Sequence, residues 1–353
     1  MRSPELLWPA ARAAARDAAV SDPAAAATAP MPWDRQQRAA ALASVAMAVP
    51  DQVVSNATVA EGAGVTEQWI VHRTGVHERR HVADGERLQD LATAAGREAL
   101  AEAGVDAADL DLVLVATLAA DELTPNCAPL VAHDLGATRA GAMDVSAACT
   151  GFLSALALAT GQIEAGRADN VLVIGADVLS RFVDKTDRGT AALFADGAGA
   201  ALVSATEDGD SGGRIGEIVQ HSDGSGAQCI RAGHDDQTIS MQGHDTFKAA
   251  VGRMSEASLE AVGGAGLELD DIDLFVYHQA NARILAAVGE RLGLDPARVV
   301  NSIDRYGNTS AATLPIALAD ARERGMLDPG TTVLLAAFGA GFTWGAGVIE
   351  WAA

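Results

Sequence analysis

The stretch DVSAACTGFLSALALA, residues 144–159, is the segment around which we expect the chain to be organised. Residues 144–148 are small and polar enough for a turn between a strand and a helix, and residues 152–163 carry the apolar face of a helix. Cys149 is therefore predicted to lie in the first turn of this helix. Unpaired N–H groups and the helix dipole favour the nucleophilic thiolate there, although a single cysteine is more often an inert core thiol.

Composition and charge limit the class of protein. The chain has 353 residues, 49% of them hydrophobic, which is ample for a buried core. A net charge of −22 repels phosphate backbones and anionic lipids, so neither nucleic acid nor a membrane is an expected partner. The three cysteines are odd in number and form no C-x-x-C pair. We therefore predict no disulfide framework, no metal site and a cytoplasmic location.

An internal repeat organises the chain. The segments EALAEAGVDAADLDL (98–112) and EAVGGAGLELDDIDL (260–274) match at an offset of 162 residues, and the same offset pairs the strand-like run 171–173 with 333–335. Short β-branched runs alternate with Ala-rich helical stretches. We therefore predict an α/β fold that is internally duplicated and has pseudo-two-fold symmetry.

The repeat also divides the chain. Residues 1–37 are predicted to be a flexible Ala-rich extension. Residues 38–208 would form one half, which carries Cys149, and residues 209–353 the other, which carries His278 and Asn308.

Polar residues at the ends of predicted strands are candidate site residues, because ligands of open α/β sheets bind beyond the carboxyl ends of strands. The predicted strand 273–276 is followed by the hydrogen-bonding run 277–281, which contains His278, and the turn that contains Asn308 leads into the helix that the repeat pairs with the Cys149 helix. Asn308 should therefore lie close to Cys149. A lone histidine or a turn asparagine is often structural, so the placement by the repeat is what favours a shared site.

Two glycine-rich segments, GAGFTWG (339–345) and DGAGA (196–200), raise the question of a nucleotide site. Neither is followed by a helix that could face a pyrophosphate, and the sequence has no P-loop. No bound cofactor is expected.

Several motifs occur in order along the chain: WIVHRTG (69–75), AACTG around Cys149, TDRGT (186–190), HSDG (221–224), HQAN (278–281), GNTSAA (307–312) and FGAGFTWG (338–345). Together they resemble the β-ketoacyl-acyl-carrier-protein synthase III family of thiolase-fold condensing enzymes, from about residue 40 to the C-terminus. The resemblance implies a five-layered αβαβα architecture, a homodimer, and acyl-CoA and malonyl-acyl carrier protein as substrates.

The resemblance also implies roles for residues. Cys149 would take the acyl group as a thioester, and His278 and Asn308 would donate hydrogen bonds to the malonyl thioester carbonyl. The loop Gly339, Ala340 and Gly341 would help to hold the tetrahedral oxyanion, and Ala340 departs from a family pattern of three glycines. Fixed donors in a dry site are what a developing oxyanion requires.

Further residues are carried over from the family in the same way. Trp69, Arg73 and Arg181 would bind CoA, whereas core packing and solvated ion pairs are the structural alternatives for them. Leu123 and Phe338 would line the acyl pocket. The residues predicted to face the acidic carrier protein are Lys248, Arg283 and Arg291.

The expected function is decarboxylative condensation that initiates fatty acid synthesis. Two alternatives stay open. The first is a starter-unit synthase or acyltransferase of polyketide or secondary metabolism, suggested by Leu123, Ala340 and the N-terminal extension. The second is a catalytically silent partner of a heterodimer, against which the complete set of Cys149, His278 and Asn308 counts.

Overall fold

The computed structural model describes residues 38–207, 213–235 and 237–352. The predicted extension, residues 1–37, lies outside the described residues. In the described part of the chain, no helix has the length and apolar character needed to cross a bilayer.

The first half contributes a five-stranded sheet, in the spatial order β1 (Arg38–Ala48), β7 (Asp196–Glu207), β6 (Asn170–Val178), β4 (Leu112–Ala116) and β5 (Gly141–Val145). β4 pairs in parallel with β5 and β6, whereas β7 is antiparallel to β6 and β1. The sequence LVLVA of β4 is almost entirely buried, as expected for a central strand covered on both faces.

The second half contributes a four-stranded sheet, in the order β8 (Arg214–Ser222), β13 (Thr343–Glu350), β12 (Thr332–Gly339) and β11 (Leu274–Tyr277). Strand order and directions repeat those of β1, β7, β6 and β4. Leu112 pairs with Val171 and Leu274 with Val333, which is the same register after the offset of 162 residues. The predicted duplication is confirmed, and among the described strands β5 has no counterpart in the second sheet.

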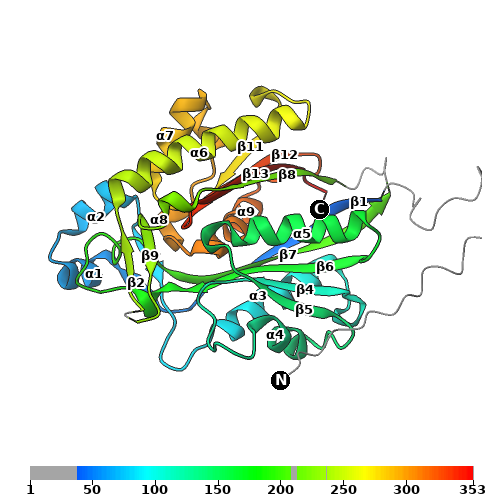
Figure 1. Cartoon of the computed structure of the whole chain (residues 1–353), viewed down its shortest axis with the longest axis horizontal. Coiled ribbons are helices and arrows are strands. Elements are labelled where there is room, and N and C mark those ends of the chain that lie inside the picture. The colour runs from blue at the N-terminus through cyan, green and yellow to red at the C-terminus, as the bar shows by residue number, and fades with distance from the viewer. Residues whose placement is uncertain (1–37, 208–212, 236, 353) are drawn as a thin grey trace, which may run out of the picture. The chain divides into compact units, whose positions relative to one another are not determined.

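Two helices, α5 (Gly151–Glu164) and α9 (Thr313–Glu323), lie between the sheets (Figure 1). Their apolar side chains, such as Leu156 and Leu318, form one core cluster with inner residues of both sheets. Burial of a side chain of this size stabilises a fold by about 1.5–3 kcal/mol.

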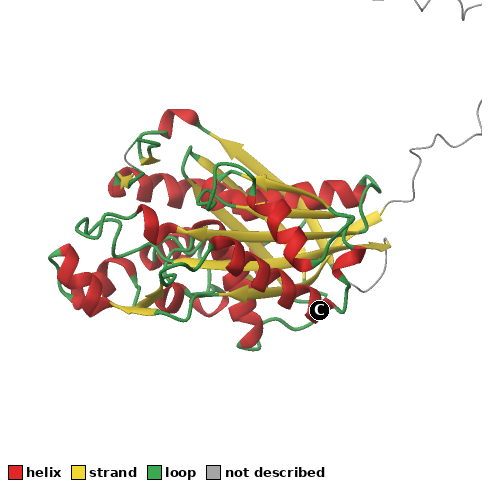
Figure 2. Cartoon of the chain, turned by 90° about the horizontal axis from the view of Figure 1, so that it is seen from below, coloured by secondary structure: helices red, strands yellow, loops and turns green. Residues whose placement is uncertain are grey.

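Further helices cover the outer faces of the sheets. α3 (Leu88–Ala103) and α4 (Cys127–Leu135) pack on the first sheet, and α6 (Gly243–Gly264) and α7 (Ala282–Leu292) pack on the second. Figure 2 shows helices lying along the strands of the sheets. The predicted αβαβα layers are therefore confirmed.

Short elements complete the described chain. They are the helices α1 (Asn56–Ala63), α2 (Glu67–Thr74) and α8 (Ile303–Tyr306), the strands β2 (Val53–Ser55), β3 (Glu78–Arg80), β9 (Ile230–Ala232) and β10 (Ile239–Met241), and the 3-10 turns η1 (Ala107–Asp109), η2 (Ala148–Thr150), η3 (Leu179–Phe182), η4 (Gly224–Gly226), η5 (Leu269–Asp271), η6 (Pro296–Arg298) and η7 (Ser310–Ala312). α1, α2 and β9 lie at one end of the layers, on the left in Figure 1.

Candidate active site

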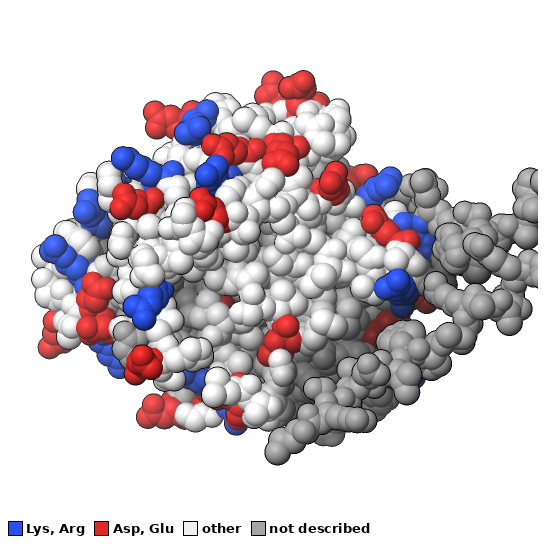
Figure 3. Space-filling view, in the orientation of Figure 1, with Lys and Arg blue, Asp and Glu red and all other residues white. Residues whose placement is uncertain are grey.

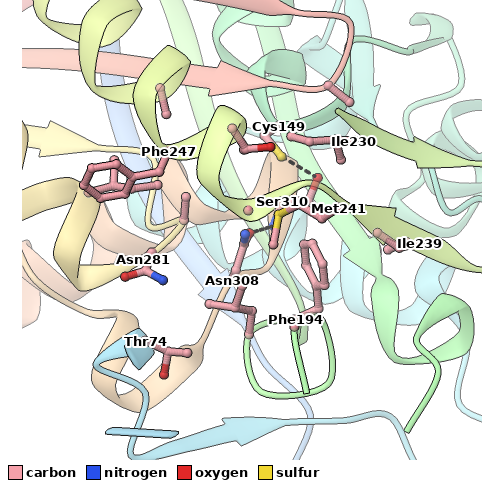
Figure 4. Close-up of a pocket in the computed structure, with 18 of the residues that line it drawn as sticks. Thr74, Cys149, Phe194, Ile230, Ile239, Met241, Phe247, Asn281, Asn308 and Ser310 are labelled. Carbon is pink, nitrogen blue, oxygen red and sulfur yellow. Dashed lines mark hydrogen bonds between the residues drawn. The ribbon is translucent and has the colours of Figure 1, made fainter. Parts of the chain in front are cut away.

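A cavity of about 790 Å³ is lined by residues of both halves. Cys149 comes from the first half, His278 and Asn308 come from the second, and all three line it. Figure 4 shows Cys149, Ser310 and Asn308 near one another in this cavity. A thiol, an imidazole and a carboxamide from distant parts of the sequence therefore share one site.

Cys149 lies at the junction between β5 and α5. Ala148, which precedes it, has a φ of 47°, and the chain then turns through η2 before α5 begins. Such a conformation costs about 1–3 kcal/mol for a residue other than glycine, so the surrounding structure must hold it. Gly339 lies directly against this turn, because a Cβ there would come within 2.9 Å of the Cys149 nitrogen. Cys149 thus occupies a 3-10 turn immediately before the helix in whose first turn we expected it.

The Cys149 thiol is protonated at neutral pH. Burial raises its pKa to about 12, although a hydrogen bond from the Ser310 hydroxyl, 3.6 Å from Sγ, opposes the rise. The charge of Asp177 raises this pKa as well. The expectation that the helix N-terminus would favour the thiolate is therefore outweighed by burial.

Alkylation of Cys149 by iodoacetamide should consequently accelerate roughly tenfold per pH unit from pH 7 to 10, whereas an ordinary thiol levels off above a pKa of about 8.5. Asp177, with a pKa of about 6, and His278, with a pKa of about 3, do not titrate in this range. Ser310→Ala removes a donor to the thiolate and should slow alkylation about tenfold at each pH.

Peptide mass spectrometry separates the Cys149 adduct from those of Cys127 and Cys229. A plateau near pH 9 in the unmodified protein would contradict the raised pKa. An unchanged rate in Ser310→Ala would contradict the role of the hydroxyl.

His278 follows β11 and is only 1% exposed. Its backbone N–H donates to Ala336 O at 2.8 Å, which fixes the residue at the strand end, and its Nδ1 lies 2.6 Å from Thr313 Oγ1. Burial lowers the pKa of the imidazole to about 3, so the ring is neutral at neutral pH. A neutral imidazole presents a donor at one nitrogen and an acceptor at the other.

Asn308 is held by its own backbone and by its side-chain oxygen. Its N–H donates to Leu193 O at 2.9 Å, and its carbonyl accepts from Ala195 N at 3.0 Å. Oδ1 accepts the N–H of Ser310 at 2.9 Å. The Nδ2 group therefore remains as the side-chain donor for a ligand in the cavity that Asn308 lines.

Asp177, which the sequence analysis missed, joins the two halves behind Cys149. It is fully buried and accepts hydrogen bonds from Thr117 Oγ1 (3.0 Å), Leu118 N (2.9 Å) and Ala311 N (3.1 Å). Burial raises its pKa to about 6. The signal was present in the sequence, because Asp177 is a charged residue near the end of the apolar strand β6, and His278 is a polar residue directly after the apolar strand β11.

The mouth of the cavity carries an aromatic ring beside two cations. The guanidinium carbons of Arg73 and Arg188 each lie 5.8 Å from the centre of the Trp69 ring, and all three residues line the cavity. The motif TDRGT contains Arg188, but the sequence analysis assigned it no role. Arg181, which was expected here, does not line the cavity, because its guanidinium pairs with Asp121 at 2.6 Å and donates to Glu86 O at 2.9 Å.

The inner wall of the cavity is apolar. It includes Leu118, Leu179, Leu193, Phe194, Ile239, Met241 and the predicted Phe338. Leu123, which was also expected here, does not line the cavity of its own chain and is 93% exposed.

The predicted oxyanion loop is tied to the Cys149 turn. Thr150 and Thr343 join through their hydroxyls at 2.9 Å, and the Thr343 hydroxyl lies 3.2 Å from Ala340 O. Of the three loop residues, Ala340 lines the cavity, whereas Gly339 packs against Cys149 and Gly341 lies outside the lining.

Among the residues that the structure describes, the charged ones that line the cavity are all basic: Arg73, Arg188, Arg231, Lys248 and Arg283. Figure 3 shows more Lys and Arg side chains at the left end than at the right, among acidic ones, while the centre of this face carries few charges. On a chain with a net charge of −22 this is a local cluster suited to an anionic ligand. Arg291, in the last turn of α7, lies outside the lining.

Comparisons with known proteins agree on one family. The model of 3-oxoacyl-(acyl-carrier-protein) synthase III matches residues 143–224, and the model of its C-terminal part matches residues 263–351. The β-ketoacyl-(acyl-carrier-protein) synthase III 2 of Streptomyces coelicolor is 44% identical over 312 residues, which cover 88% of this chain and 94% of the relative.

Solved structures give the same result. The 3-oxoacyl-(acyl-carrier-protein) synthase III of Aquifex aeolicus superposes with a TM-score of 0.85 at 38% identity, covering 88% of this chain and 100% of that one. The priming β-ketosynthase of the R1128 polyketide biosynthetic pathway superposes with a TM-score of 0.85 at 35% identity, covering 90% of this chain and 97% of that one.

Proposed function

This chain belongs to the 3-oxoacyl-(acyl-carrier-protein) synthase III family, and from that premise we propose that it condenses a short acyl-CoA with malonyl-acyl carrier protein through an acyl-Cys149 intermediate, initiating fatty acid synthesis. The observation that carries the proposal is the convergence of Cys149, His278 and Asn308 on one cavity with an apolar interior and a cationic mouth.

The first half-reaction is a thioester exchange. The Cys149 sulfur attacks the acyl-CoA carbonyl, the bond to the CoA sulfur breaks, and the proton of the thiol leaves with CoA as its free thiol. Because the pKa of Cys149 is about 12, the proton must leave as the sulfur attacks. The N–H groups at Cys149 and Ala340 are the proposed donors to the tetrahedral oxyanion.

The second half-reaction is decarboxylation followed by carbon–carbon bond formation. The bond to the malonyl carboxylate breaks, CO₂ leaves, and the electron pair is delocalised onto the thioester oxygen as an enolate. His278 and Asn308 donate hydrogen bonds to this oxygen. The enolate carbon then attacks the acyl carbonyl, and Cys149 leaves as a thiolate and takes up a proton.

Intact-protein mass spectrometry after incubation with a panel of acyl-CoAs tests the proposal. The expected result is a single covalent adduct whose mass identifies the preferred starter. Absence of any adduct would overturn the proposal and would favour a silent partner of a heterodimer.

CoA is proposed to bind at the mouth, with its adenine on Trp69 and its phosphates near Arg73 and Arg188. Arg188→Ala should therefore raise KM for acyl-CoA about tenfold and change kcat little, because a charged contact made equally in the ground state and the transition state affects binding alone. Steady-state kinetics measures both parameters. Arg181→Ala is the matched control, since Arg181 lies outside the cavity; an equal rise in KM in this variant would contradict the assignment.

A second candidate function is priming of polyketide synthesis, which the similarity to the R1128 priming synthase favours. A priming synthase of this kind would catalyse the same two half-reactions with a different acyl-CoA starter or a different acceptor. Assaying acyl-CoAs together with several carrier proteins separates the two functions.

The acidic carrier protein is proposed to dock at the mouth of the cavity against Lys248 and Arg283, with Arg291 further along α7. This docking should weaken as salt is raised.

A homodimer is proposed through the face that carries β5 and α5. Among the described strands β5 pairs only with β4, so it is an edge strand, and exposed edges of this kind are usually covered. Met143 is 50% and Leu158 47% exposed on these elements. The centre of the face on which Figure 1 labels β5 and α5 has few charges in Figure 3. Sedimentation should give twice the 36.0 kDa of one chain. Free thiols and a CoA substrate fit the cytoplasm, which is the proposed compartment.

A further inference from the structure

Thr313, the first residue of α9, lies against a buried nitrogen of His278. Both residues are only 1% exposed, so their polar atoms depend on protein partners. Thr313 Oγ1 lies 2.6 Å from His278 Nδ1 and 3.0 Å from Ser310 O. Oγ1 therefore has both the imidazole nitrogen and the carbonyl oxygen within hydrogen-bonding distance.

The carbonyl of Ser310 does not depend on this proton. It already accepts the backbone N–H of Thr313 where η7 passes into α9. The threonine hydroxyl can point to Nδ1 without leaving the carbonyl unpaired.

We propose that Thr313 is a positioning residue that fixes the tautomer of His278: its hydroxyl donates to Nδ1, so the single ring proton of the neutral imidazole resides on Nε2. Nε2 is the ring nitrogen left for a substrate in the cavity that His278 lines. The consequence for catalysis rests on the proposed function. An Nε2–H stabilises the enolate oxygen, whereas the opposite tautomer would present a lone pair to it.

The segment that ends at Thr313 thereby contacts each of the three site residues. The Ser310 hydroxyl donates to Cys149 Sγ, and the Ser310 N–H donates to Asn308 Oδ1. Thr313 completes the set at His278. One turn of backbone therefore fixes the relative positions of the Cys149 sulfur, the Asn308 amide and the His278 imidazole.

The tautomer can be read directly. In the full-length protein labelled with ¹⁵N-histidine, long-range ¹H–¹⁵N correlation distinguishes a ring protonated on Nε2 from one protonated on Nδ1, and His278→Gln identifies the signal. The expected pattern is protonation on Nε2. Protonation on Nδ1 would overturn the proposal whether or not any variant folds.

Thr313→Val removes the hydroxyl at nearly constant side-chain volume, whereas Thr313→Ser keeps a hydroxyl at this position. Decarboxylation of malonyl-acyl carrier protein should fall about tenfold or more in Thr313→Val and recover in Thr313→Ser, as is typical for partners that orient a functional histidine. The ring ¹H–¹⁵N correlation of His278 should change in Thr313→Val and stay unchanged in Thr313→Ser.

Decarboxylation at the original rate in Thr313→Val, with an unchanged correlation, would also overturn the proposal. If the unmodified protein shows the Nε2 tautomer but consumes no malonyl-acyl carrier protein, the proposed function fails and the tautomer assignment stands.

Discussion

Cys149→Ala should abolish formation of the acyl-enzyme. A methyl group cannot form a thioester, and loss of a nucleophile that acts as a unit with its site typically lowers the rate on the order of 10⁵-fold or more. Intact-protein mass spectrometry with acyl-CoA measures the result directly. We expect the mass of the variant to stay unchanged at times when the unmodified protein is fully acylated.

Cys229→Ala is the matched control for this experiment. Cys229 is a partly buried thiol whose sulfur lies 4.0 Å from Gln242 Oε1, and it does not line the cavity. Its removal should leave the adduct in place. An acyl adduct that persists in Cys149→Ala would show that the nucleophile is a different residue.

His278→Ala and Asn308→Asp should leave acylation of Cys149 largely intact and lower decarboxylation by about 10²–10³-fold, the usual loss for one donor to a developing oxyanion. Aspartate is the sharper replacement at position 308, because it keeps an acceptor for the Ser310 N–H and removes the amide donor. Acylation is measured by mass spectrometry and decarboxylation by release of CO₂ from malonyl-acyl carrier protein.

His221→Ala serves as the control histidine. His221 pairs with Glu260 at 2.8 Å and lies outside the cavity, so both half-reactions should continue. If His278→Ala or Asn308→Asp slowed acylation as much as decarboxylation, the division of roles between the two half-reactions would be wrong.

The sequence was most informative where the chain repeats itself. The offset of 162 residues predicted a duplicated fold, and the structure confirms it, because Leu112 pairs with Val171 and Leu274 with Val333 in the same register. It also placed Asn308 near Cys149, since equivalent helices of a duplicated fold meet at the pseudo-axis. These inferences depend on the local pattern of apolar residues and on the internal repeat, and both can be found in the sequence itself.

Properties that depend on distant neighbours were harder to predict. Arg181 and Arg188 are alike in the sequence, and the structure separates them because Asp121, sixty residues away from Arg181, takes up its guanidinium. Burial reverses the effect expected of the helix dipole at Cys149. Ser310 gains its importance from its contact with Cys149 across the interface between the halves, and Thr313 from its contact with His278, 35 residues away in the same half; no local pattern reports either contact.

The close approach of the two halves has a consequence for synthesis on the ribosome. A Cβ on Gly175 would lie 2.3 Å from Ala311 O, so the strand behind the nucleophile and the turn beyond Asn308 fit together with no space to spare. The core cluster likewise draws on both sheets. A nascent chain that has emerged only as far as residue 208 therefore contains Cys149 but lacks His278 and Asn308. Catalytic activity should appear in a single late step, when the second half packs against the first.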